Sequence, residues 1–228
     1  MIFTSIIFRN GINMETTFKT HWENLYGGKT EQEYSWFQPY PHTSIEFIEY
    51  FKLPKNARII DIGGGDSRLV DALLNMGYTD VTVLDISAAA IEKAKQRLGN
   101  QALQIKWIVS DVNEFEPAAG QYDFWHDRAA FHFLTTEALV RHYVDIAQRA
   151  IRPGGYFVLG TFSPTGPKKC SGLDIRQYSR AAMHAVFAPF FRRIRCKEEA
   201  HVTPFQTTQH FLFCSFRRRR ERLPLPII

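Results

Sequence analysis

The chain contains few cysteines, and their spacing does not indicate a disulfide framework. Its 3 Cys are Cys170, Cys196 and Cys214, an odd number without the Cys-x-x-Cys spacing. We therefore expect neither a disulfide framework nor a zinc knuckle, and a reducing, cytoplasmic compartment is the simplest interpretation. The sequence also lacks an apolar run near the roughly 20 residues that a membrane-spanning helix needs, which excludes a membrane span.

An excess of charge of one sign is also missing over most of the chain. The net charge is +5, and residues 217–222, five arginines and one glutamate, supply +4 of it. This run follows the last predicted strand and has no interleaved aromatic residues, so we expect a solvated basic tail over 217–228 rather than a nucleic-acid surface. The 228 residues are 45% apolar and 22% charged, which excludes collagen, coiled coil and disorder and predicts one globular domain.

The N-terminal part precedes the regular pattern. Residues 1–8 are apolar but too short for a signal peptide, and no basic stretch or small-residue cleavage site flanks them. We expect a disordered extension over 1–13, upstream of a natural start at Met14. The aromatic stretch from Trp22 to Tyr40 is predicted to be a lid, and Thr43 or Ser44 is predicted to cap a helix, so that 14–57 forms an aromatic lid and helix.

After residue 57, β-branched runs alternate with helical patterns, which is typical of a parallel sheet covered by helices. Strands are predicted at 58–62, 81–85, 105–109, 122–126 and 156–162, and helices at 67–76, 87–98, 136–151 and 178–187. Two further runs, 192–202 and 206–216, alternate like the arms of a hairpin. The sequence therefore predicts an α/β domain over 58–216 with a seven-stranded, mostly parallel sheet whose last strand is antiparallel.

The strongest local motif is Asp-Ile-Gly-Gly-Gly-Asp-Ser-Arg-Leu at residues 61–69, between a predicted strand and a predicted helix. Glycines let the backbone approach a ligand closely, and the free N–H groups of a helix start favour negative charge. Asp85 ends the next strand, where a carboxylate can accept both hydroxyls of a ribose. Asp111 follows the third strand. Three successive strand ends thus present acidic groups at one edge of the sheet.

With these residues in place, the chain resembles class I S-adenosylmethionine-dependent methyltransferases from about Trp22 to Phe216. The resemblance implies a Rossmann-like three-layer sandwich, S-adenosylmethionine as cofactor and S-adenosylhomocysteine as product. In that family the glycine turn holds the methionine part, the second acid binds the ribose and the third binds the adenine amine. Carried over, these roles fall on Asp61, Gly63, Gly64, Gly65 and Asp66, then on Asp85 with Ile86, and then on Asp111 with Val112; Trp36 and Asp127 are assigned to the same cofactor site.

A finer resemblance concerns the branch that contains thiopurine-type small-molecule methyltransferases and lysine methyltransferases of elongation factors. The glycine turn and the segments 83–87 and 122–128 look like this branch. The branch's Asp-Lys-Gly, however, is Asp127-Arg128-Ala129 here. No Asn-Pro-Pro-Tyr follows the fourth strand, so nucleobase and glutamine amino groups are disfavoured as acceptors.

In-line methyl transfer requires positioning, desolvation and the removal of one proton, but no covalent nucleophile. We name His132 and Arg128, in the loop after the fourth strand, as catalytic candidates. His132 is the candidate base because an unperturbed imidazole titrates near pH 6.5. The alternative is that residues 131–134 pack under the sheet.

The predicted function is methyl transfer to a small molecule, because no added domain or basic groove indicates a macromolecular partner. A protein lysine methyltransferase is the alternative within the family, and a non-catalytic S-adenosylmethionine-binding module is the alternative of another class. Cys170 is assigned an incidental role. No metal is assigned, because His201 and His210 lack a third ligand. No nucleic-acid or membrane partner is expected, and the oligomeric state stays open.

Overall fold

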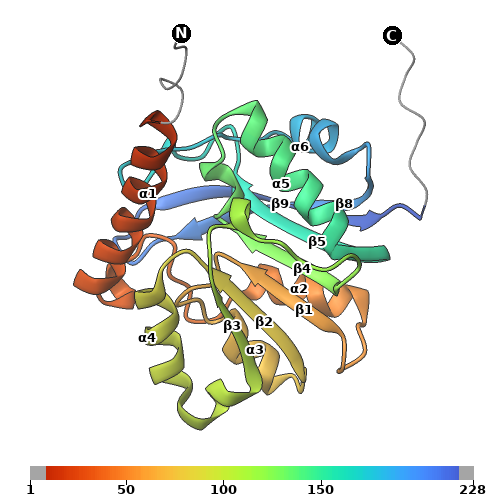
Figure 1. Ribbon diagram of the computed structural model, residues 1–228, viewed down its shortest axis with the longest axis horizontal. Coiled ribbons are helices and arrows are strands. Elements are labelled where there is room, and N and C mark those ends of the chain that lie inside the picture. The colour runs from red at the N-terminus through yellow and green to blue at the C-terminus, as the bar shows by residue number, and fades with distance from the viewer. Residues whose placement is uncertain (1–8, 221–228) are drawn as a thin grey trace, which may run out of the picture.

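A computed structural model describes residues 9–220, with side chains described from Phe18 onward (Figure 1). Its main sheet has seven strands in the order β3-β2-β1-β4-β5-β9-β8. The five strands from β3 to β5 are parallel, and β9 is antiparallel to both of its neighbours. The predicted sheet with an antiparallel last strand is therefore confirmed. The strands are β1 (Arg58–Ile62), β2 (Asp80–Asp85), β3 (Ile105–Val109), β4 (Tyr122–Arg128), β5 (Ile151–Phe162), β8 (Phe191–Val202) and β9 (Thr208–Arg218).

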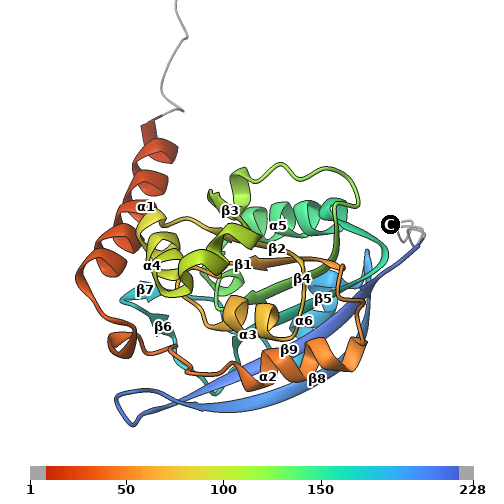
Figure 2. The same ribbon diagram turned by 90° about the horizontal axis from the view of Figure 1, so that it is seen from below.

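Helices cover both faces of this sheet, as Figure 2 shows with α5 on one side and α2 and α3 on the other. Ile60 and Ile62 of β1 pack with the α5 and α6 face, whereas Ile59 packs with the α2 and α3 face. This alternation follows from the two-residue period of a strand. The helices are α1 (Arg9–Gly28), α2 (His42–Phe51), α3 (Leu69–Asn75), α4 (Ala88–Leu98), α5 (Glu137–Ala150) and α6 (Arg180–Phe187), with short 3-10 turns η1 (Glu31–Glu33), η2 (Gly99–Gln104), η3 (Val112–Glu114) and η4 (Phe131–Phe133) and a small hairpin of β6 (Lys169–Cys170) and β7 (Leu173–Asp174).

Local signals set several boundaries where they were expected. The first and third strands have the predicted bounds, and Ser87 Oγ accepts the Ala90 N–H at 3.1 Å as the cap of α4. The expected cap of α2 is wrong: Pro41 is the N-cap residue, and Thr43 and Ser44 lie inside the first turn. The fifth strand begins at Ile151, earlier than predicted, because the Pro-Gly-Gly stretch that ends the helix continues directly as strand.

The two ends of the chain differ from the expected boundaries. Helix α1 begins at Arg9, within the segment expected to be disordered, and residues 1–8 lie outside the described residues. The basic run at 217 is not all tail, because β9 continues to Arg218. Arg217 lies over the Tyr156 ring at 5.6 Å, and Arg219 donates to the Ala188 carbonyl at 3.3 Å. The remainder, 221–228, lies outside the described residues.

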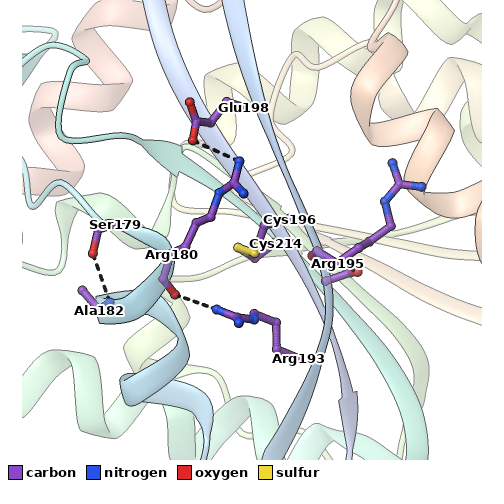
Figure 3. Close-up of a disulfide and its surroundings, with 9 residues drawn as sticks. Ser179, Arg180, Ala182, Arg193, Arg195, Cys196, Glu198 and Cys214 are labelled. Carbon is purple, nitrogen blue, oxygen red and sulfur yellow. Dashed lines mark hydrogen bonds and ion pairs between the residues drawn. A yellow bond between two sulfur atoms is a disulfide. The ribbon is translucent and has the colours of Figure 1, made fainter.

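The cysteine prediction is wrong for one pair. Cys196 of β8 and Cys214 of β9 lie opposite each other, and their sulfur atoms are bonded, with the Cα atoms 4.1 Å apart (Figure 3). Cys170 is free and buried. The spacing of cysteines along the chain does not reveal which residues strand register brings together. Disulfides form mainly in oxidising compartments, so the cysteines do not support a reducing compartment.

None of the helices in the described residues combines the length and the hydropathy that crossing a bilayer requires.

Candidate functional site

The carboxyl ends of the parallel strands meet at one edge of the sheet, and the glycine turn lies there. Gly63 and Gly65 have φ angles of +63° and +32°, a region that side chains rarely adopt. A Cβ atom on Gly64 would lie 2.6 Å from Asp61 Oδ2, and one on Gly65 would lie 2.7 Å from Asp85 Oδ2. The turn therefore has to be glycine, because two carboxylates pack directly against its backbone.

Two cavities open beside this turn. The first has acidic strand ends on one side and aromatic rings on the other. The second lies over the turn itself. Both are lined by Tyr26, Trp36, Gly63 and Arg128, so they adjoin each other.

Asp85 is the buried acid of the first cavity. Its side chain is only 5% exposed, and its Oδ1 accepts the Ser87 N–H at 2.8 Å. Burial raises the pKa of Asp85 to about 7, and the negative charges of Asp61 and Glu23 act in the same direction. The Asp85 carboxylate is therefore a hydrogen-bond acceptor at the end of β2 that receives few hydrogen bonds from the protein itself.

A buried hydrogen-bonded chain leads away from the second cavity. His126 Nδ1 lies 2.6 Å from Asp61 Oδ1, and His126 Nε2 lies 2.9 Å from Ser44 Oγ. An ionised carboxylate only accepts, so Nδ1–H donates to Asp61; in the neutral imidazole, Nε2 then accepts the Ser44 hydroxyl. All three residues line the second cavity. The chain fixes the direction in which the Asp61 carboxylate points.

Most residues predicted for the cofactor line one of the two cavities. Gly65, Asp66 and Asp127 do not have the role that the motif alone implied. Gly65 lines neither cavity and instead makes room for Asp85. Asp66 lines the second cavity but is ion-paired with Arg97. The residues found at the cavity surfaces are Asp61, Gly63, Gly64, Asp66, Asp85, Ile86, Asp111, Val112 and Trp36.

Asp127 is placed away from both cavities, so its assignment to the cofactor is corrected. Its Oδ1 accepts the N–H groups of Ala130 and Phe131 at 3.0 and 3.2 Å, and its Oδ2 accepts the Tyr143 hydroxyl at 2.7 Å. Burial raises the pKa of Asp127 to about 6. These bonds shape the loop after β4, which is a structural role.

The two catalytic candidates are placed very differently. His132 is fully buried, lines neither cavity and stacks on Phe162 with ring centroids 4.8 Å apart. Burial, with the charge of Arg128, lowers the pKa of His132 to about 3, so the imidazole is neutral. The structure therefore does not support His132 as the base. Arg128 lines both cavities, and its Nη1 donates to the Trp36 carbonyl at 3.0 Å.

Sequence reasoning missed several residues of the site. Phe18 and Phe133 belong to the aromatic wall of the first cavity, which consists of Phe18, Trp22, Tyr26, Trp36 and Phe133. Ser44 and His126 form the hydrogen-bonded chain behind Asp61. Ser44 was interpreted only as a helix cap. The available signal was a histidine next to an aspartate at the end of a buried strand, which indicates a polar strand end but not its partner.

A family model described as "Methyltransferase domain" matches residues 59–155. EEF1A lysine methyltransferase 2 of Danio rerio is 27% identical over 124 residues, 52% of this chain and 53% of that protein. The eEF1A lysine and N-terminal methyltransferase of Mus musculus is 27% identical over 117 residues, 51% of this chain and 16% of that protein. The chain thus spans about half or less of the length of these curated relatives.

Solved structures show the same fold at low identity. A structure from work on the conversion of a disulfide bond into a thioacetal group during echinomycin biosynthesis has a TM-score of 0.73 and 19% identity, covering 89% of this chain and 93% of that chain. The 1,6-didemethyltoxoflavin-N1-methyltransferase of Burkholderia thailandensis, solved with 1,6-didemethyltoxoflavin and S-adenosylhomocysteine, has a TM-score of 0.66 and 16% identity, covering 96% and 93%. Together with the glycine turn and the acidic strand ends, these matches confirm the predicted resemblance of this chain to class I S-adenosylmethionine-dependent methyltransferases.

Proposed function

We propose that this chain transfers a methyl group from S-adenosylmethionine to a small-molecule acceptor. The observation that carries the proposal is the first cavity, where the buried Asp85 and the acidic Asp111 face a wall of aromatic rings. An apolar cavity with a few convergent polar groups is the usual form of a small-molecule site.

The residues present fit the cofactor. Asp85 and Asp111 can accept hydrogen bonds from hydroxyl and amine groups, and Ile86 and Val112 offer apolar surface beside them. The carboxylates packed against the glycine turn suit a cationic sulfonium ligand and would repel the pyrophosphate of a dinucleotide. Asp61, held by His126, offers its carboxylate to the ammonium of a methionine moiety.

The aromatic wall lines the part of the first cavity that we assign to the acceptor. Trp22 lies against Trp36 and Phe133 with ring centroids 5.8 and 5.2 Å apart, and Phe18 lies 5.8 Å from Phe133. Helix α1 carries Phe18 and Trp22, and Figure 1 shows it beside α4. An apolar wall of aromatic rings favours a compact acceptor over a folded protein surface.

Helix α1 is fastened to the site by one acidic residue. Both carboxylate oxygens of Glu23 accept backbone N–H groups at the start of α4, from Ala88 at 2.8 Å and Ala89 at 3.0 Å. Glu23 also accepts the Ser87 hydroxyl at 2.9 Å. Ser87 directly follows Ile86 of the cavity wall, so the lid and the cofactor side are joined by these bonds.

The mechanism needs little from the protein besides placement. When bound, S-adenosylmethionine supplies a methyl group already activated on a sulfonium. Asp85 and the Asp61–His126–Ser44 chain hold the two ends of the site, and the aromatic wall excludes water, which strengthens electrostatic interactions inside. Positioning of two reactants in line is itself a large contribution to rate.

A protein lysine methyltransferase is the second candidate, because the curated relatives that match carry that name. The two functions differ in what is enclosed: a lysine side chain enters a channel while its protein stays outside. A non-catalytic S-adenosylmethionine-binding module is the third hypothesis, and it predicts cofactor binding without turnover.

Transfer of a labelled methyl group tests the proposal. The purified protein is incubated with methyl-labelled S-adenosylmethionine and either a panel of small amines, thiols and carboxylates or a cell lysate. We expect label in small molecules, and we expect Asp85→Ala to abolish it while Asp80→Ala does not. Asp80 begins the same strand, pairs with Lys106 and lies far from the cavities along β2, which makes it a matched control. Label only in lysate proteins contradicts the small-molecule proposal, and binding without any transfer contradicts an enzyme.

A further inference from the structure

Arg128 ends β4 between the two cavities and is held there by contacts on two sides. Its Nη1 donates to the Trp36 carbonyl at 3.0 Å, and its guanidinium carbon lies 4.7 Å from the centroid of the Phe211 ring. Its Nε and Nη2 are buried, yet within the described part of the chain neither has a hydrogen-bond partner. One edge of a fixed guanidinium is therefore left unused.

An unused charged edge is costly in this environment, because a buried cation needs a paired anion or hydrogen bonds. Among residues 18–220, none forms an ion pair with Arg128. Asp61 is engaged by His126. Glu199 accepts from Gln38 at 2.8 Å through its Oε1, whereas its Oε2 is buried without a hydrogen-bond partner in the described residues and forms no ion pair with Arg128. Burial lowers the pKa of Arg128, with Glu199 acting in the opposite direction, but an arginine keeps its charge in proteins.

The two free atoms have a defined geometry. Nε–H and the Nη2–H beside it point the same way and form the lateral fork of the guanidinium, which matches the two oxygens of a carboxylate. The neighbouring carboxylates of Asp61 and Asp85 disfavour a more highly charged anion such as a phosphate dianion. A singly charged planar anion fits the fork best.

We propose that the lateral fork of Arg128 binds a carboxylate within the ligand cavities. This inference rests on the proposed function, because the carboxylate belongs either to the methionine part of the cofactor or to the methyl acceptor. If it belongs to the acceptor, then the substrate class is a small carboxylic acid with an apolar or aromatic body that suits the wall of Trp22, Trp36 and Phe133.

The test is calorimetric titration of the full chain and of three variants, Arg128→Met, Arg128→Lys and Arg195→Met. Arg195→Met is the matched control: Arg195 also lies over a phenylalanine ring, Phe47 at 4.5 Å, but pairs with Glu46 and lines neither cavity. The titrants are S-adenosylhomocysteine and its decarboxylated analogue and then, with S-adenosylhomocysteine saturating, benzoate and benzamide.

We expect Arg128→Met to weaken binding of one carboxylate ligand at least tenfold and to leave its carboxylate-free counterpart within twofold. A loss confined to S-adenosylhomocysteine assigns the fork to the cofactor, and a loss confined to benzoate assigns it to the acceptor. Arg128→Lys keeps the charge without the fork and is expected to fall between wild type and Arg128→Met, while thermal melting confirms that both variants fold.

Two results overturn the inference. One is equal loss for a ligand and its carboxylate-free counterpart. The other is unchanged affinity of Arg128→Met for S-adenosylhomocysteine together with no preference of the wild type for benzoate over benzamide. A different result would contradict the proposed function alone. If the protein binds S-adenosylhomocysteine through Arg128 but transfers no methyl group, then the inference about Arg128 holds and the proposed enzyme activity does not.

Discussion

Replacing Asp85 by Asn should make the ligand-free protein more stable while it loses the cofactor. Asp85 is 5% exposed at the end of β2, and burial raises its pKa from 3.8 to about 7. A charged carboxylate is therefore disfavoured in the folded state. The amide of Asn has nearly the same shape and carries no charge. Its Oδ1 can still accept the Ser87 N–H, although its Nδ2 cannot accept the Gly65 N–H, which makes the gain an upper bound.

The magnitude follows from linkage. The raised pKa of Asp85 means that its favourable contribution is complete below pH 3.8 and is lost as pH rises through about 7. A shift of about three pH units corresponds to roughly 4 kcal/mol. Asp85→Asn should therefore gain up to about 4 kcal/mol at pH 8 and almost nothing at pH 4. For a chain of this size that is a rise of about 8–16 °C in Tm at pH 8.

Thermal melts of wild type and Asp85→Asn at pH 5 and pH 8 measure this gain, and calorimetry measures S-adenosylhomocysteine binding. Asp80→Asn, at the partly buried start of the same strand, is the control and should leave cofactor binding unchanged and stability nearly unchanged at both pH values. The reasoning is refuted if Asp85→Asn is no more stable than wild type at pH 8, or if its gain is the same at both pH values.

Three further predictions follow from the same contacts. Because ligand hydroxyls bind the ionised form of Asp85, the Kd for S-adenosylhomocysteine should rise as pH falls below about 7, which titrations between pH 6 and 8 check; a flat profile contradicts the pKa assignment. Ser44→Ala leaves His126 Nε2 without its partner and should lower stability by about 1–3 kcal/mol and weaken cofactor binding several-fold, as melts and titrations would show; unchanged affinity would separate the chain from the cofactor. Replacing Cys196 and Cys214 by Ser together should lower the free energy of unfolding by about 3 kcal/mol under oxidising conditions, given the 18-residue separation, and equal urea stability of wild type with and without reductant would contradict the pairing.

Features that depend on local chain chemistry were predicted from the sequence. The bounds of β1 and β3, the Ser87 cap of α4 and the place of Asp85 at the end of β2 all follow from strand patterns and capping preferences within a few residues. The order of acidic strand ends led to the cavity because parallel strands bring their carboxyl ends to one edge.

Features that depend on long-range register were not predicted. Cys196 and Cys214 meet only because β8 and β9 pair in one register. Neighbouring residues at the end of β4 point to opposite faces of the sheet, so Asp127 contacts Tyr143 whereas Arg128 lines the cavities. In the sequence both are polar residues at a strand end, which does not separate their roles. His132 was chosen by its intrinsic pKa, which burial beside Phe162 changes entirely.

The central claim is that the strand ends around Asp61, Asp85 and Asp111 form an S-adenosylmethionine site. Calorimetric titration of the purified chain with S-adenosylmethionine and, separately, with NAD tests it most directly. The account predicts binding of S-adenosylmethionine in the micromolar range and none of NAD, because the carboxylates at the turn repel a pyrophosphate. Binding of NAD, or of neither ligand, would contradict it.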